Sequence, residues 1–379
     1  MTTGITLHCP RCERQFAPDG QTRCLEHDEP TVLELSYDVD SIRDQLDPDF
    51  SGSSLWRYRE LLPVDGVDPV TLGEGWTDLV TAPTTGAELG VELSLKLEGN
   101  NPTGSAKDRG STVVATRAKS RGCTGVICAS TGNAAASIAA YAARGNLECS
   151  LFVPERLPEA KAIQPRVYGA DLITVEGSYG DAYEACRTQG LDSERIDRSA
   201  GTNPYVPAGS QTLGFELAEQ TESPDWIAIS MGNGGTIADL WRGWRLFERL
   251  GSVDGSPRLL GVQAESAAAI QRDGDRVADS AGTCADSIDV DEPHRKLDAR
   301  EAIADSGGTA VTVSDEMIHK SLRMLGSNEG VFAEPASAAA VAGIERARQQ
   351  GTIDPGEGVV AVITGDGLKD TATAARTLD

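Results

Sequence analysis

The sequence has no long apolar run and few basic residues. No stretch reaches the roughly 18 consecutive apolar residues that a transmembrane helix requires, so we expect no membrane span. Lysine and arginine together number 34, against 58 aspartates and glutamates, and only seven of the 34 are lysines. The formal charge of −24 repels nucleic acid and anionic lipid, so neither nucleic acid nor membrane is an expected partner.

The N-terminal stretch from Met1 to His8 also lacks the basic and apolar regions of a secretory signal peptide. We therefore expect a soluble, cytoplasmic protein. Its acidic residues are spread along the chain rather than gathered in a tail, a distribution that fits a salt-rich cytoplasm, where screening reduces repulsion between carboxylates. A protein adapted in this way is expected to lose structure in low salt.

Eight cysteines in a chain of 379 residues without a signal peptide do not indicate a disulfide scaffold. Five of them lie in apolar or helical surroundings and are expected to be small buried hydrophobes. These five are Cys123, Cys128, Cys149, Cys186 and Cys284.

The other three cysteines lie close together near the N-terminus. Cys9 and Cys12 form a Cys-x2-Cys knuckle, and Cys24 and His27 form a Cys-x2-His pair. Two such pairs can supply four tetrahedral ligands to zinc and leave no open position, which predicts a structural site in a zinc-ribbon-like segment, residues 1–30. The alternatives are a knuckle that has lost its metal and chance clustering. Too few basic and aromatic residues flank it for a nucleic-acid-binding ribbon.

From residue 91 onward, short apolar strands alternate with glycine-rich loops and helices. This alternation predicts an α/β protein with a parallel sheet covered on both faces, whose ligands bind beyond the carboxyl ends of the strands. The expected strands are 91–97, 126–129, 149–153, 172–175, 226–230, 259–263, 310–313 and 359–363, and the expected helices include 111–120, 315–326 and 335–349. Residues 31–75 are expected to form an arm across the main body, and residues 70–77 have strand character that closes in a glycine turn.

The loop of residues 101–109 carries Lys107 between an expected strand and an expected helix. Pro102 and Gly104 predict a tight turn that delivers Lys107 near the start of the helix. The helix N–H groups and Arg109 create a positive potential there, which favours the neutral, nucleophilic amine that Schiff-base chemistry with an aldehyde requires. The alternative is an ordinary surface lysine in a turn.

A second strand-to-helix loop consists of Gly232, Asn233, Gly234, Gly235 and Thr236. Glycines let backbone N–H groups converge at the start of a helix, where the helix dipole adds positive potential, so the loop is suited to a phosphate. It lacks the Lys-Ser/Thr of a nucleotide P-loop and the spacing of a dinucleotide fingerprint. Many strand-to-helix turns are rich in glycine, so this loop alone is a weak signal.

Neutral donors end two further expected strands. Ser130, Thr131 and Gly132 place hydroxyl and backbone donors at a helix start, which suits a carboxylate, and Asn133 is placed to reach a phenolic oxygen. Thr364 presents a neutral hydroxyl after the last strand. Taken alone, each set is also explained by ordinary helix capping.

Together these loops offer a phosphate site, an amine for an aldehyde, a donor for a phenolic oxygen and a neutral partner for a ring nitrogen, which describes pyridoxal phosphate. Over residues 70–370 the chain resembles the threonine synthase group of fold-type II pyridoxal-phosphate enzymes. The resemblance is carried by five segments: Asn-Pro-Thr-Gly-Ser-Ala-Lys-Asp-Arg-Gly110, Ser-Thr-Gly-Asn133, Gly-Asn-Gly-Gly-Thr236, Glu329-Gly-Val-Phe-Ala-Glu-Pro-Ala-Ser-Ala338 and Ile363-Thr-Gly-Asp-Gly-Leu-Lys-Asp370.

The resemblance implies a role for each matching residue. Lys107 would bind the cofactor's aldehyde and then move protons, and Asn133 would bond the ring oxygen. Residues 232–236 would hold the cofactor's phosphate, and Thr364 would face the pyridine nitrogen. Residues 130–132 would bind the substrate's carboxylate. A hydroxyl at the ring nitrogen favours elimination and replacement over transamination.

The resemblance also implies the architecture: a tryptophan synthase β-like fold with a large and a small domain, and a homodimer acting on a small amino-acid substrate. Residues 31–110 would form the N-terminal arm and the first part of the large cofactor domain. Residues 111–165 would form the small, mobile domain that binds the substrate's carboxylate, and residues 166–379 the rest of the large domain.

Threonine synthases convert O-phosphohomoserine and water to threonine and phosphate, and the chain departs from this group where the substrate's phosphate would bind. The group's usual Gly-Gln-Lys-Thr is here Gly209-Ser-Gln-Thr212, which puts Gln211 in place of a lysine, although Lys161 lies where another lysine is expected. A segment near Asp286 also differs. The open alternatives are a threonine or serine ammonia-lyase or a β-replacement enzyme such as a cysteate synthase, and a non-catalytic zinc-ribbon module.

Overall fold

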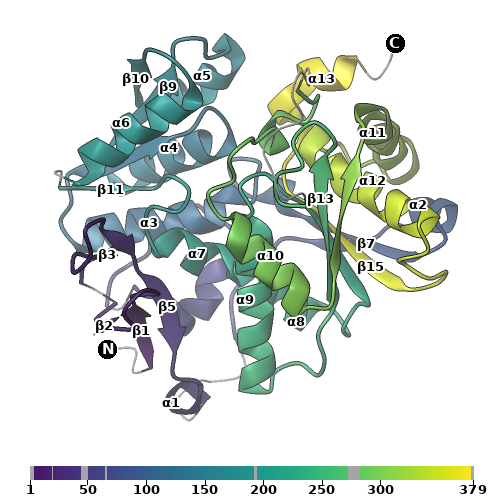
Figure 1. The fold of residues 1–379 in the computed structure, drawn as a ribbon, viewed down its shortest axis with the longest axis horizontal. Coiled ribbons are helices and arrows are strands. Elements are labelled where there is room, and N and C mark those ends of the chain that lie inside the picture. The colour runs from purple at the N-terminus through teal and green to yellow at the C-terminus, as the bar shows by residue number, and fades with distance from the viewer. Residues whose placement is uncertain are drawn as a thin grey trace. The chain divides into compact units, whose positions relative to one another are not determined.

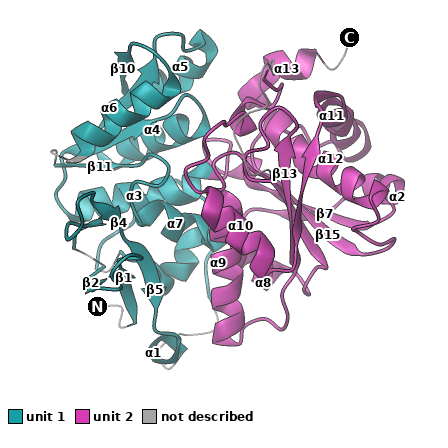
Figure 2. Cartoon of the chain, viewed as in Figure 1, with its two compact units in different colours: residues 1–76, 107–212 teal, residues 77–106, 213–379 magenta. Residues whose placement is uncertain are grey.

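The computed structural model describes residues 4–18, 20–43, 50–64, 66–191, 194–271 and 282–376. The chain forms two compact units, each built from two separate segments (Figure 1, Figure 2). Unit 1 comprises Met1–Trp76 and Lys107–Thr212, and unit 2 comprises Thr77–Ala106 and Leu213–Asp379. The expected small domain, residues 111–165, falls inside unit 1.

Unit 2 is built on a six-stranded sheet with the order β14-β13-β12-β15-β7-β6. Neighbouring strands are parallel except β6 and β7, which pair antiparallel at one edge. The strands are β6 (Leu79–Thr81), β7 (Glu92–Leu97), β12 (Trp226–Ser230), β13 (Arg258–Ala264), β14 (Thr309–Val313) and β15 (Gly358–Ile363). The inner strands β12 and β15 are almost continuous apolar runs, as expected where both faces of a parallel sheet are covered.

The helices of unit 2 bury this sheet. Helix α12 packs on β12, β13, β14 and β15 with a face of alanines, and a Cβ at Gly343 would meet Val262 at 2.2 Å, so only glycine permits this approach. The helices are α2 (Pro83–Leu89), α8 (Thr212–Gln220), α9 (Gly235–Leu250), α10 (Lys296–Asp305), α11 (Asp315–Glu329), α12 (Pro335–Gln349) and α13 (Thr371–Ala375).

Unit 1 contains a four-stranded parallel sheet with the order β10-β9-β8-β11. Its strands are β8 (Gly125–Ala129), β9 (Glu148–Pro154), β10 (Asp171–Val175) and β11 (Arg195–Asp197). Its helices are α3 (Lys107–Ser120), α4 (Asn133–Gly145), α5 (Glu159–Val167), α6 (Tyr179–Leu191) and α7 (Tyr205–Ser210).

The N-terminal part of unit 1 is a small antiparallel module. It consists of β1 (Ile5–His8), β2 (Gln15–Phe16), β3 (Arg23–Cys24), β4 (Thr31–Val32) and β5 (Glu34–Tyr37), followed by helix α1 (Val39–Arg43). Four buried side chains form its core: Leu7, Cys9, Cys24 and Leu33. The 3₁₀ helix η1 (Leu55–Leu61) then covers α3 and α4 with Leu55 and Leu62.

All eight expected parallel strands are present, and helix α12 has the expected bounds. Two expectations were wrong. Helix α3 begins at Lys107, four residues before the expected start, so this lysine is the first helical residue rather than part of the loop. Residues 70–77 form no strand, because Gly73, Gly75 and Trp76 have φ values of 92°, 80° and 48°, which an extended strand excludes. Within the described part of the chain, no helix has the length and apolarity needed to cross a membrane.

Candidate active site

Three neighbouring parallel strands of unit 2 end at the same edge of the sheet. Strand β15 lies between β12 and β7, and all three run in one direction. The glycine loop follows β12, Thr364 follows β15, and the segment leading to Lys107 follows β7. The topology of one sheet therefore gathers three of the motifs that are far apart in the sequence.

The segment before Lys107 is fixed to the loop after β15 by backbone hydrogen bonds. Ala106 N–H donates to the carbonyl of Thr364 (2.9 Å), and Asp366 N–H donates to the carbonyl of Gly104 (3.0 Å). Lys369 Nζ donates to the carbonyl of Thr103 (2.9 Å). Gly104 has a φ of 85°, which explains why the tight turn requires glycine.

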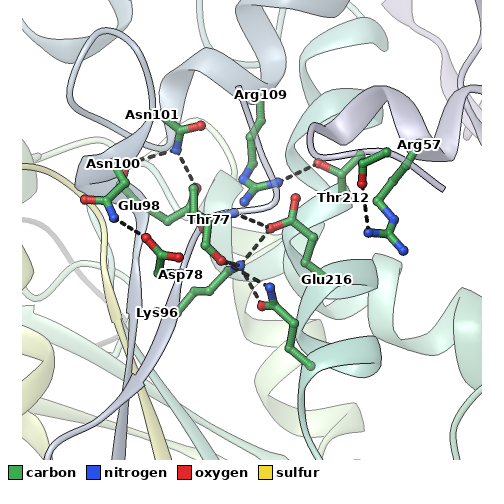
Figure 3. Close-up of polar contacts among 12 residues, drawn as sticks. Arg57, Thr77, Asp78, Lys96, Glu98, Asn100, Asn101, Arg109, Thr212 and Glu216 are labelled. Carbon is green, nitrogen blue, oxygen red and sulfur yellow. Dashed lines mark hydrogen bonds and ion pairs between the residues drawn. The ribbon is translucent and has the colours of Figure 1, made fainter. Parts of the chain in front are cut away.

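A buried polar network supports the same segment from below (Figure 3). Glu98 has no exposed surface, and it accepts hydrogen bonds from Thr77 Oγ1 (2.6 Å) and Asn101 Nδ2 (3.1 Å). Lys96 Nζ is also fully buried and pairs with Glu216 at 2.7 Å. Each charged group has several partners, so the network holds the turn in one conformation.

Lys107 itself begins α3 in unit 1 and is half-buried. Asp108 and Arg109 beside it are fully buried, and Arg109 Nη1 donates to Thr212 Oγ1 (3.0 Å). A Cβ at Gly209 would lie 1.9 Å from the carbonyl oxygen of Arg109, so α3 and α7 touch through their backbones. A half-buried lysine flanked by a rigid helix start differs from the exposed turn lysine of the alternative interpretation.

Thr364 lies in a chain of hydroxyl and carboxyl groups. Its Oγ1 is 2.9 Å from Ser337 Oγ and 3.3 Å from Glu334 Oε1, and Ser337 Oγ accepts from Gly365 N–H (2.8 Å). Ser337 and Glu334 come from the start of α12, and Glu334 is buried although it is a carboxylate. The sequence indicated the threonine but gave no sign that a buried glutamate accompanies it.

The glycine loop opens α9, whose N-cap residue Gly234 provides no side-chain cap. A Cβ at Gly232 would lie 2.6 Å from the Ser287 carbonyl oxygen, and one at Gly234 would lie 2.7 Å from that of Arg295, so both positions require glycine. Asn233 accepts hydrogen bonds from the backbone N–H groups of His294 and Arg295. Residues 286–293, which depart from the family pattern, therefore pack against the glycine loop.

In unit 1, residues 130–133 join the end of β8 to the start of α4, and all four are half-buried. Ser130 Oγ accepts from Gly132 N–H at 3.3 Å, and α4 has no side-chain cap. A Cβ at Gly132 would meet no atom within 4 Å, so there is open space at this helix start. Thr131 and Asn133 occupy the same turn, as expected for a small anionic ligand.

The two expected substrate-phosphate residues lie in different surroundings. Lys161 is half-buried on α5. Gln211 is 4% exposed, and its Nε2 donates to the Tyr37 hydroxyl, which in turn donates to the Leu61 carbonyl (3.1 Å). The side chain of Gln211 is therefore held by the N-terminal module.

The four expected metal ligands come together. One ligand atom from each of Cys9, Cys12, Cys24 and His27 lies within 4.8 Å of all the others. Cys9 Sγ is 3.2 Å from His27 Nε2, and Cys12 Sγ is 3.9 Å from Cys24 Sγ. Burial raises the pKa of the Cys9 thiol, but the N–H groups of Cys12 and Arg11 and the His27 ring outweigh it and lower this pKa to about 6. Such a donor set is compatible with zinc.

The comparisons with known proteins agree with this geometry. Residues 70–365 match the family model described as pyridoxal-phosphate dependent enzyme. The threonine synthase of Methanocaldococcus jannaschii is 38% identical over 91% of this chain and 88% of its own. That of Halalkalibacterium halodurans is 40% identical over 86% and 93%, and that of Methanosarcina acetivorans is 36% identical over 97% and 93%.

Solved structures show the same fold at lower identity. Maize serine racemase superposes with a TM-score of 0.69 at 20% identity, covering 80% of this chain and 91% of that one. Threonine deaminase isoform 2 from Solanum lycopersicum gives 0.68 at 22% identity, covering 86% and 94%. The fold is therefore that of the fold-type II enzymes. The chain belongs to the family of pyridoxal-phosphate dependent enzymes. Within that family, it is a member of the threonine synthase group.

The residues present fit pyridoxal phosphate. The uncapped start of α9 offers backbone N–H groups in a loop where Cβ atoms are excluded, as a phosphate requires. Thr364 offers a neutral hydroxyl for the ring nitrogen, and Ser337 lies beside it. Lys107 supplies the amine for the cofactor's aldehyde.

Proposed function

We propose that the chain is a threonine synthase, which converts O-phosphohomoserine and water to threonine and inorganic phosphate. Curated threonine synthases of similar length and 36–40% identity support this activity. The observation that carries this proposal is a set of backbone contacts. They join the residues just before Lys107 to the residues that follow β15, where Thr364 lies.

Pyridoxal phosphate, when bound, would supply an electron sink for the electron pair released at the substrate's Cα. The backbone N–H groups of residues 232–236 would hold its phosphate, and Asn133 would donate to its ring oxygen. Thr364 would face the ring nitrogen, with its hydroxyl held by Ser337. A neutral hydroxyl there leaves the ring unprotonated, which favours elimination.

Lys107 Nζ would bind the cofactor's aldehyde and, once displaced by the substrate's amine, remove the proton from the substrate's Cα and then one from Cβ. Ser130, Thr131 and Gly132 would orient the substrate through its carboxylate. The Cγ–O bond breaks with its electron pair leaving on the phosphate, and Cγ gains a proton to become a methyl group. Water then adds its hydroxyl to Cβ, a proton returns to Cα, and the remaining proton is taken up by the released phosphate. The half-buried position of Lys107 limits access of bulk water to the amine.

The second candidate is an ammonia-lyase or a β-replacement enzyme such as a cysteate synthase. It is favoured by Gln211, which stands where the family has a lysine and which binds Tyr37 instead of pointing to open space. A substrate without a phosphate would not need a cation at that position.

One assay separates the candidates. The purified holoenzyme in high salt is given O-phosphohomoserine, and phosphate and threonine are measured; threonine and serine are given separately, and ammonia is measured. We expect equal amounts of phosphate and threonine. Phosphate without threonine, or ammonia as the only product, would contradict the proposal.

The proposal includes a structural zinc ion bound by Cys9, Cys12, Cys24 and His27. The mutual distances of these ligand atoms support it, and with four protein ligands the metal would have no open position for chemistry. We also expect a homodimer in the cytoplasm, because the family resemblance implies a dimer, and light scattering of the purified protein tests it.

A further inference from the structure

Arg198 is a buried cation to which the chemistry above gives no role. It follows β11 directly, and its side chain is 4% exposed. Its guanidinium donates from Nε to Ser111 Oγ (3.2 Å) and from Nη2 to the Lys107 carbonyl (3.5 Å), and both acceptors are neutral. It makes no ion pair with any residue that the structure describes. A buried guanidinium without a counterion is unusual, because the burial of an uncompensated charge is strongly unfavourable.

The adjacent carboxylate does not neutralise it. Asp197 is the last residue of β11 and Arg198 follows it, and the two side chains reach different partners. Asp197 Oδ1 accepts from the Ser199 N–H (2.8 Å) and lies 3.7 Å from Cys186 Sγ on α6, whereas Arg198 reaches α3. Burial lowers the pKa of Arg198, and acidic groups around it, including Asp108 and Asp197, offset only part of this effect. The side chain nevertheless remains a cation at neutral pH.

The backbone of Arg198 pairs with the strand that leads to residues 130–132, the proposed carboxylate loop. Arg198 N–H donates to the Ile127 carbonyl (2.8 Å) in the neighbouring strand β8, three residues before Ser130. Lys107 and Ser111 are four residues apart on α3, so they share one helix face, and Arg198 contacts both. Its Nη1 makes no hydrogen bond to the described residues and is available to a ligand.

The other candidates in unit 1 are less suited to a doubly charged anion. Gln211 is neutral and bound to Tyr37, and Arg156 and Arg166 are exposed. Lys161, half-buried on α5, offers a single point charge rather than the two parallel donors of a guanidinium. We propose that Arg198 binds the phosphate group of the substrate, an inference that rests on the proposed function. The planar guanidinium matches two phosphate oxygens, and it neutralises the charge that the oxygen gains when the Cγ–O bond breaks. Arg198 would thus be the residue that selects a phosphorylated substrate.

The test compares holoenzymes of wild type and Arg198→Gln. We expect the KM for O-phosphohomoserine to rise roughly tenfold to hundredfold, the range for charge-assisted hydrogen bonds. The affinity for L-threonine, which has no phosphate and is followed through the cofactor's absorbance, is expected to stay unchanged. Arg198→Lys keeps the positive charge but loses the parallel donors of the guanidinium, and it should give an intermediate KM. The matched control is Arg195→Gln, since Arg195 lies on β11, three residues before Arg198, and already pairs with Glu148.

A purely structural role would weaken the binding of both ligands equally, and that result would overturn the proposal. If Arg198→Gln does not fold, Arg198→Lys provides the same comparison. Failure of the proposed function is recognised separately, because wild type would then release no phosphate from O-phosphohomoserine. In that case inorganic phosphate is titrated into both holoenzymes by calorimetry: binding that is lost in Arg198→Gln supports the anion site, and equal binding, or none by wild type, overturns it.

Discussion

The hydroxyl groups of Ser337 and Thr364 lie 2.9 Å apart, although 27 residues separate them in the chain. Ser337 comes from the first turn of α12 and also accepts the buried N–H of Gly365 at 2.8 Å. It therefore fixes both the backbone and the side chain that follow β15. Ser337 on helix α12 therefore fixes the orientation of Thr364, the proposed partner of the ring nitrogen.

Ser337→Ala should lower kcat more strongly than it lowers the stability of the fold. Removing the hydroxyl leaves the Gly365 N–H without its partner, a loss of about 1–3 kcal/mol in unfolding free energy. It also frees Thr364 to turn away, and misplacement of a group at the reacting centre lowers kcat by on the order of tenfold or more. Kinetics and denaturant unfolding measure the two effects. The matched control is Ser321→Ala, a buried serine on α11 whose hydroxyl has no partner among the described residues; equal kcat losses in the two variants would contradict this role.

Lys96→Met should strongly destabilise unit 2. It removes the Lys96 ammonium from the buried Glu216 carboxylate, and breaking a buried pair costs about 3–5 kcal/mol. Lys320→Met is the control, because Lys320 pairs with Glu345 at 2.5 Å but is half exposed, where such a pair contributes at most about 1 kcal/mol. Denaturant midpoints followed by tryptophan fluorescence measure both. A loss for Lys96→Met no larger than that of the control would show that the buried network does not hold the segment before Lys107.

The sequence predicted the parallel strands of both sheets except β11, because most of them are short apolar runs near glycine-rich loops. It also predicted that the loops after β7, β12 and β15 lie at one sheet edge, since parallel neighbours end there together. It did not predict the Lys96–Glu216 pair or the burial of Arg198, because isolated charged residues in a sequence resemble surface residues. Residues 70–77 form no strand because the expected glycine turn takes up Gly73, Gly75 and Trp76, all three with positive φ.

Removal of metal should unfold the N-terminal module. We expect about one zinc per chain by elemental analysis, because a structural site takes four protein ligands. Cys12→Ser should lose the metal, whereas Cys123→Ser, a half-buried cysteine outside the cluster, should retain it. Chelation should also loosen Gln211, which hydrogen-bonds to Tyr37 at the end of β5, and faster proteolysis within residues 1–37 would report the change. A metal-free protein that resists proteolysis equally well would contradict the site.

Low salt should lower the thermal stability of the whole chain. A formal charge of −24 is self-repulsive, and the Debye length shortens from about 10 Å at 0.1 M salt to about 3 Å at 1 M. The melting temperature, measured by circular dichroism, should therefore rise with potassium chloride but much less with an uncharged osmolyte at equal osmolarity. Equal effects of salt and osmolyte would show that charge screening is not the cause.

The most direct test of the account is to identify the lysine that binds the cofactor. The holoenzyme is reduced with borohydride, which makes the bond between lysine and cofactor permanent, and its peptides are analysed by mass spectrometry. Among the seven lysines of the chain, the pyridoxyl group is expected on Lys107 alone, and Lys107→Ala should lose both the label and the cofactor's absorption band. A label on Lys96, Lys161 or any other lysine, or an unaltered band in Lys107→Ala, would contradict the assignment of the active site.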